Sequence, residues 1–541
     1  MAADGSRMPQ ELWRGITVPD VEQLMAGLTI PPRSAALHDL WRRLIIAKGA
    51  EPTGGKTATH FLALRLAALY RSGLLEDLEI ATASAVPAAS TATDGTPKVG
   101  EEPTGDLVLA VQRAKAQLGL GQREAACASA RSARYQGEVP RPVAQDALLL
   151  IAYCAAAEGN AAAASLTADL AREQRMEAPL AFAVIDHLAG STDAAGDKMA
   201  KGPATFKPAI PKDISLIDYR FLELAKAHAG VRLLERAEPA LIAALARETA
   251  ADPRTRIEAA EDAARIHALD AASLAAAYRA VALPANGADP LTARLEAPMK
   301  RAALAQAIAA EQTPERKARL MQALLQEARA HTLYVPVAQG LGTELKALRQ
   351  TGDLAFFAET AVEIALAGAD YATAVSWSVF GSASAAGARG DGLMHWMTLI
   401  DIAGAKAYVP RGSGLRLTEE LAVKGKFPPE MLHRLVTVLD ALEYDIPIPL
   451  WDAASRTPQP AKGYLPETGV LPRLKAAAGE RKFALTVLLA MQALGPDGAE
   501  GAHMLALGDA IRALKRAGLE EDARRLGFEA LFATWPRGAG G

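Results

Sequence analysis

The chain repeats one pattern: an alanine-rich apolar run, a glycine, and a second alanine-rich run that starts at once. The pattern occurs at Gly73, Gly159, Gly352 and Gly518. Glycine readily adopts the left-handed backbone conformation that ends many helices, so each occurrence predicts two consecutive helices. Helix pairs laid end to end are typical of α-solenoids. We therefore predict an all-α fold of irregular helix hairpins forming an α-solenoid, interrupted by long loops rich in Pro, Gly and Ala.

The composition favours the same fold class. Apolar residues make up 50% of the 541 residues but aromatic residues only 5%, so most of the apolar content is alanine and leucine. Alanine has the highest helix propensity, and its small side chain lets neighbouring helices approach closely. The runs of β-branched and aromatic residues that are typical of strands are nearly absent. The alanine-rich, asparagine-poor composition also resembles that of bacterial proteins.

The helical pattern is interrupted by three stretches of different composition. The first is rich in alanine, serine and threonine, the second in glycine, lysine and proline, and the third in proline. We predict the following segments: an N-terminal helical segment (1–80), a low-complexity linker (81–105), helix-hairpin repeats (106–190), a loop (191–213), a helical repeat body (214–443), a Pro-rich irregular segment (444–472) and a C-terminal helical module (473–541).

The helix junctions resemble those of tetratricopeptide-type repeats. In that family a turn glycine ends the first helix and an alanine follows five residues later. The matching pairs are Gly121 with Ala126, Gly159 with Ala164, and Gly518 with Ala523; near Tyr371 and Ala374, Ala369 takes the place of the glycine. The resemblance implies the fold of the junctions and no binding residue. The spacing of the turns does not keep the family's 34-residue period.

The charge balance excludes one class of partner. The chain has 59 basic and 62 acidic residues, a net charge of −3, and no basic stripe of the kind that binds nucleic acid. No apolar run approaches the ~20 residues of a membrane-spanning helix. The first residues lack the basic and apolar regions of a signal peptide. We expect a cytoplasmic protein with a protein or peptide partner, no nucleic acid and no membrane span.

The two cysteines, Cys127 and Cys154, both lie in predicted helices. One interpretation is two small buried thiols, since free cysteine is often buried. The other is a disulfide, because Cys127 lies on the second helix of one hairpin and Cys154 on the first helix of the next. A disulfide would place the protein in an oxidising compartment such as the periplasm.

The sequence offers little catalytic chemistry. The segment from Ala50 to Thr57 fits a relaxed phosphate-binding loop, with Lys56 and Thr57 in the functional places and alanine in place of the first glycine. The residues before it are typical of a helix end rather than of the strand that such a loop follows, so we interpret it as an ordinary loop. The nine histidines are scattered singly. We therefore expect no catalytic residue, no metal site and no cofactor.

The tryptophans are the candidate interaction anchors, because exposed aromatic residues often dominate protein interfaces. The alternative is that each is buried in a core or anchors a loop. The six residues are Trp13, Trp41, Trp377, Trp396, Trp451 and Trp535.

These observations favour a non-enzymatic helical-repeat scaffold that binds another protein. Two alternatives stay open. One is a periplasmic or envelope-associated structural protein with a Cys127–Cys154 disulfide. The other is an all-α enzyme whose site is assembled from residues far apart in the sequence.

Overall fold

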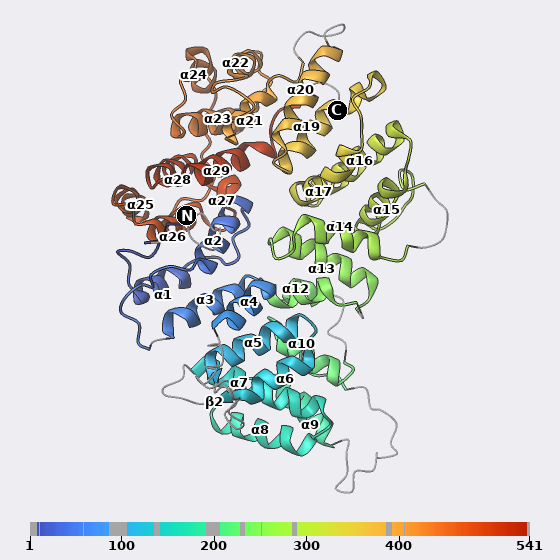
Figure 1. The fold of residues 1–541 in the computed structure, drawn as a ribbon, viewed down its shortest axis with the longest axis vertical. Coiled ribbons are helices and arrows are strands. Elements are labelled where there is room, and N and C mark those ends of the chain that lie inside the picture. Colours follow the sequence, from blue (N-terminus) through green and yellow to red (C-terminus); the bar gives the residue numbers. More distant parts are fainter. Residues whose placement is uncertain are drawn as a thin grey trace, which may run out of the picture. The chain divides into compact units, whose positions relative to one another are not determined.

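The fold is that of a computed structural model of the chain. It describes residues 8–9, 11–57, 59–85, 105–134, 141–190, 206–227, 233–249, 251–283, 289–385, 392–404 and 406–537. In these residues the chain is all-α, with 29 α-helices, one 3-10 helix and two strands of two residues each (Figure 1). The predicted fold class is confirmed at this level.

The chain divides into two compact units. Unit 1 combines residues 1–61 with residues 264–541, and unit 2 consists of residues 62–263. Helices α3 (His60–Arg71) and α13 (Pro253–Arg265) contain the two points of division. The first residues of the chain thus belong to the same unit as its last helices, an arrangement that local helix pairing does not predict.

Unit 2 is built from helix pairs in chain order. Helices α5 and α6 pack against each other, as do α7 and α8, and α10 returns to pack against α7 and α9. The two short strands pair in parallel, Gly105 opposite Ala133 and Asp106 opposite Arg134. The elements of this unit are α4 (Leu75–Ala85), β1 (Gly105–Asp106), α5 (Leu107–Gly119), α6 (Arg123–Ser132), β2 (Ala133–Arg134), α7 (Arg141–Ala157), α8 (Ala161–Glu173), α9 (Pro179–Gly190), α10 (Leu216–Leu224), α11 (Leu233–Arg236) and α12 (Pro239–Arg247).

Unit 1 joins both ends of the chain. Helix α2 packs against α26 and α29, while α19 and α20, and α28 and α29, form consecutive pairs. Its elements are α1 (Val18–Ala26), α2 (Ala35–Ile46), α14 (Ala271–Ala280), α15 (Ala297–Ala310), α16 (Pro314–Ala330), α17 (Tyr334–Gly340), α18 (Gly342–Lys346), η1 (Gly352–Phe357), α19 (Ala358–Ala367), α20 (Tyr371–Ala385), α21 (Trp396–Ile402), α22 (Leu415–Val423), α23 (Pro429–Ala441), α24 (Ile448–Ser455), α25 (Val470–Gly479), α26 (Phe483–Leu494), α27 (Gly498–Gly501), α28 (Met504–Arg516) and α29 (Glu520–Phe532).

Most of the junction glycines have the predicted conformation. Gly73, Gly121, Gly159 and Gly518 have φ values between 71° and 91°. At the junction between α19 and α20, Ala369 takes the left-handed conformation itself, with φ of 53°. Gly352 is the exception: it begins the 3-10 helix η1 and does not end a helix, so the prediction was wrong there.

The alanines five residues after these junctions are packing residues. Ala126, Ala164, Ala374 and Ala523 are all buried. Each lies on the second helix of a pair whose two helices pack against each other. A larger side chain at these positions would separate the two helices or force a shift of the backbone. The repeated pattern in the sequence therefore encodes close helix–helix contact.

Two of the predicted interruptions fall largely outside the described residues. Residues 86–104 of the linker and 191–205 of the first loop lie outside the described residues, and α4 extends through residues 81–85. The segment 444–472, predicted as irregular, contains helix α24 and the first turn of α25. Pro447 is the residue before α24 and Pro449 lies in its first turn, where a missing backbone N–H breaks no helical hydrogen bond.

A pair of neighbouring histidines, of which His38 is buried, lies in unit 1. The rings of His38, on α2, and His267 are 5.1 Å apart, and His267 Nε2 lies 2.8 Å from the Arg33 carbonyl oxygen. Burial lowers the pKa of His38 to about 3, helped by the nearby positive charges of His267 and Arg42. His38 is therefore neutral in the folded protein well below the pH at which a free histidine gains its proton.

This pKa predicts an acid-sensitive unit 1. Between about pH 7 and about pH 4.5 the unfolded chain binds a proton at His38 that the folded chain does not, so stability falls as the pH falls. Relative to His38→Gln, the unfolding free energy of the wild type should drop by about 2.5 kcal/mol over this range. Urea unfolding followed by tryptophan fluorescence measures it, since all six tryptophans lie in unit 1. Equal pH dependence in the two proteins would contradict the prediction.

Candidate functional site

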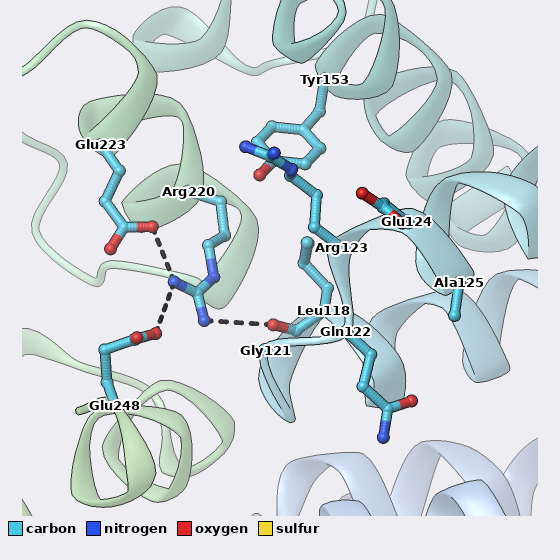
Figure 2. Close-up of a pocket in the computed structure, with 10 residues that line it drawn as sticks. All are labelled: Leu118, Gly121, Gln122, Arg123, Glu124, Ala125, Tyr153, Arg220, Glu223 and Glu248. Carbon is cyan, nitrogen blue, oxygen red and sulfur yellow. Dashed lines mark hydrogen bonds and ion pairs between the residues drawn. The ribbon is translucent and has the colours of Figure 1, made fainter. Parts of the chain in front are cut away.

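The candidate site is a pocket of about 610 Å³ in unit 2. Residues of α5, α6, α7 and α10 and the residue after α12 line it (Figure 2). The lining residues are Leu118 from α5; Gly121 and Gln122 from the turn after it; Arg123, Glu124 and Ala125 from the first turn of α6; Tyr153 from α7; Arg220 and Glu223 from α10; and Glu248, the residue after α12.

The turn between α5 and α6 forms one side of the pocket. Gly121 has a φ of 76°, a conformation that costs other residues strain, and its N–H donates to the Leu118 carbonyl. The Gln122 N–H donates to the Gln117 carbonyl, and the Gln122 carbonyl accepts from Ala126. The chain therefore reverses within two residues. The first turn of α6, whose N–H groups have no partner within the helix, faces the pocket.

The disulfide between Cys127 and Cys154 joins two of the helices that line the pocket. It joins α6 to α7, and its Cα atoms are 5.5 Å apart. Both sulfur-bearing residues are buried in the same apolar core as Ala126 and Tyr153. Of the two interpretations of the cysteines, two buried thiols or a disulfide, the structure has the disulfide. Because Arg123 and Tyr153 are close neighbours of the two cysteines, the bond fixes these pocket side chains relative to each other.

Arg220 organises the opposite side. Its side chain is almost completely buried, and Nη1 lies 2.7 Å from Glu223 Oε2 and 3.1 Å from Glu248 Oε2. Nη2 donates to the Leu118 carbonyl at 3.1 Å. Burial acts to lower the pKa of Arg220, but the charges and hydrogen bonds of Glu223 and Glu248 outweigh it and raise the pKa. One guanidinium thus connects α5, α10 and the end of α12.

Tyr153 is the most buried polar side chain of the pocket, with 3% of its surface exposed. Its ring packs edge-on against Phe221 at 5.6 Å between centroids. Burial raises the pKa of Tyr153, while the positive charges of Arg220 and Arg123 oppose the shift. Its hydroxyl makes no hydrogen bond with any residue that the structure describes, and Figure 2 shows it directed into the space between α6 and α10.

Five of the six tryptophans proposed as anchors are buried in unit 1. Trp13 packs edge-on against Phe61, Trp377 packs edge-on against Phe357, and Trp535 packs edge-on against Phe427. Trp41 and Trp396 are also buried, and the Trp396 indole N–H donates to the Glu359 carboxylate. These five serve the core, because large aromatic side chains bury the most apolar area. They offer no exposed surface to a partner.

Trp451 is different, because 45% of its surface is exposed. It lies on α24 three residues after Ile448, of which 74% is exposed. Side chains three residues apart lie on the same side of a helix. Ile448 and Trp451 therefore form an exposed apolar pair, called here the α24 pair.

The remaining motifs lie outside the pocket. The loop-like segment from Ala50 to Thr57 follows α2, which ends at Ile46, and the Thr53 carbonyl accepts from the Val18 N–H at 2.9 Å. Among the described residues no group of three or more His, Cys, Asp or Glu side chains is placed to hold a metal ion. None of the helices in the described part of the chain is long and apolar enough to cross a membrane.

Sequence reasoning pointed to the cysteines beside the pocket but missed its polar residues. Arg220 and Glu223 are three residues apart on one helix, a visible but common pattern. Tyr153 and Glu248 carry no local signal, because only the packing of α7, α10 and α12 brings them to the same place. No protein-family model, curated protein or solved structure matches the chain.

Removing the disulfide should destabilise unit 2. The bond closes a loop with a sequence separation of 27, which in the chain-entropy account stabilises the fold by about 3.5 kcal/mol. We expect the double variant Cys127→Ala, Cys154→Ala to lower the protection of α5–α7 amides by this amount. Hydrogen exchange followed by mass spectrometry measures it, with peptides from residues 264–537 as the internal reference. Unchanged protection in α5–α7 would contradict the prediction.

The two arginines of the pocket should differ sharply in their contribution to stability. Arg220→Met removes a buried guanidinium with three polar partners and should cost about 2–3 kcal/mol, since Glu223, Glu248 and the Leu118 carbonyl lose their donor. Arg123→Met, at an exposed position on the same pocket, is the matched control and should change stability by about 0.5 kcal/mol at most. Hydrogen exchange of unit 2 compares them, and equal effects would show that the Arg220 contacts do not hold the site together.

Proposed function

We propose that the protein is a non-enzymatic helical-repeat interaction protein, an irregular α-solenoid that binds a protein partner. The α24 pair carries this proposal. Of the six tryptophans only Trp451 offers a large exposed surface, and the neighbouring Ile448 extends it. Exposed aromatic and aliphatic side chains that lie together are typical anchors of protein interfaces.

The consecutive helix pairs support the repeat interpretation. In unit 2, α5 with α6 and α7 with α8 pack in chain order, and α7 also contacts α5 and α6. Such stacking leaves one side of each pair available to a partner, as in other helical-repeat proteins. The chemical groups of the unit 2 pocket are guanidinium, carboxylate, amide and phenol, which suit recognition by hydrogen bonds and charge.

The disulfide favours an oxidising compartment. Disulfides persist in the periplasm and in secreted proteins and are rare where glutathione and thioredoxin keep thiols reduced. Cys127 and Cys154 are bonded to each other and buried. We therefore favour the periplasmic alternative over the cytoplasmic location expected from the sequence, with the same interaction function.

The test is capture of the partner with a variant that lacks the anchor. The double variant Ile448→Ala, Trp451→Ala removes two exposed side chains and should leave unit 1 folded. It should retain at least ten times less of a partner that co-purifies reproducibly with the wild type from the native cell. Val379→Ala, which removes an exposed side chain from α20, is the matched control and should retain it fully. Equal retention by all three proteins, or no reproducible partner, would contradict the proposal.

A further inference from the structure

The hydroxyl of Tyr153 is available in the pocket for a hydrogen bond to a ligand. A phenol both donates and accepts hydrogen bonds, so it usually has a protein, water or ligand partner. Tyr153 is 3% exposed, yet its hydroxyl has no such partner among the described residues and points into the pocket. A ligand that hydrogen-bonds there would satisfy it.

The α6 side of the pocket offers hydrogen-bond donors next to the single carboxylate of Glu124. Arg123 lies on the first turn of α6, and the unpaired N–H groups of that turn face the same space. The partial positive charge at a helix N-terminus adds to that of the arginine. A carboxylate is the acceptor that matches guanidinium, phenol and backbone N–H donors together.

The opposite side of the pocket carries acceptors. Glu223 and Glu248 share the single guanidinium of Arg220, so the group of three has a net charge of −1. Both carboxylates are partly exposed and retain oxygen lone pairs for a further donor. Figure 2 shows them on the α10 and α12 side, across from Arg123 and Gln122. A ligand cation would balance the remaining negative charge.

The overall charge of the lining decides between a simple anion and a zwitterion. Arg123 and Arg220 are opposed by Glu124, Glu223 and Glu248, which leaves one negative charge in excess. A phosphate or sulfate ion would meet three carboxylates and is therefore disfavoured. A ligand with one carboxylate and one ammonium group matches the donors on the α6 side and the acceptors on the α10 side without adding net charge.

We propose that the unit 2 pocket binds a small zwitterion of the amino acid or short peptide class. Its carboxylate accepts hydrogen bonds from Tyr153, Arg123 and the first turn of α6, and its ammonium group donates to Glu223 and Glu248. The pocket volume of about 610 Å³ is in the range of small-molecule sites. This activity goes beyond the proposed function, since it involves a small molecule and does not depend on a protein partner or on the α24 pair.

The test is calorimetric titration of the full chain with L-alanine, di-L-alanine and tri-L-alanine. At least one of the three should bind, and the length that binds best reports the separation of the two sides of the pocket. The N-acetylated and the C-amidated forms of that ligand should each bind at least ten times more weakly, because each lacks one of the two charges. Inorganic phosphate, titrated in parallel, should not bind.

Three variants assign the contacts. Tyr153→Phe keeps the ring and removes only the hydroxyl, so it should weaken the best ligand about tenfold while unit 2 keeps its hydrogen-exchange protection. Arg123→Gln should also weaken binding of the best ligand about tenfold. Glu248→Gln should weaken binding of the free ligand more than binding of its N-acetylated form. The proposal is overturned if none of the three ligands binds at about 10 mM, if an end-blocked form binds as well as the free one, if phosphate alone binds, or if Tyr153→Phe binds normally.

Discussion

The covalent bond between Cys127 and Cys154 is the constraint on which the organisation of unit 2 depends. It connects the second helix of one pair to the first helix of the next, so two neighbouring pairs cannot separate. Both cysteines are buried in one apolar core, in which Ala126 lies beside Cys127. Two pocket side chains, Arg123 and Tyr153, are carried by the same two helices. Stability and the shape of the site thus have a common origin.

Arg220 provides the second constraint, and it acts by charge. A buried guanidinium is stable only where acceptors surround it, and here Glu223, Glu248 and the Leu118 carbonyl supply them. These contacts hold α10 and the end of α12 against α5. They also leave two carboxylates at the edge of the pocket with more negative charge than Arg220 neutralises. The cluster of Arg220, Glu223 and Glu248 therefore both holds these helices together and supplies charged groups to the pocket.

The helix junctions could be predicted from the sequence because their causes are local. A glycine that takes positive φ and an alanine that allows close packing act within a few residues, and Ala369 takes the same conformation where the glycine is missing. The sequence could not predict in this way which tryptophans are exposed and which are buried. Trp451 and Trp396 both lie on helices in unit 1, and only the packing of distant segments determines that one is exposed and the other buried.

The pocket shows the same limit more clearly. Arg220 and Glu223 are neighbours on one helix, but Tyr153 and Glu248 reach them only because α7 and α12 pack on α10 and α5. In a similar way, joining residues 1–61 to the C-terminal helices is a non-local event that helix pairing does not signal.

The pairing of the two cysteines in the native protein is the most direct test of the account. The protein would be isolated from its own cells with free thiols alkylated at lysis, digested without reduction, and analysed by mass spectrometry. We expect one disulfide-linked species that joins the peptides containing Cys127 and Cys154, and no alkylated form of either. Full alkylation of both cysteines would contradict both the covalent link between α6 and α7 and the proposed oxidising compartment.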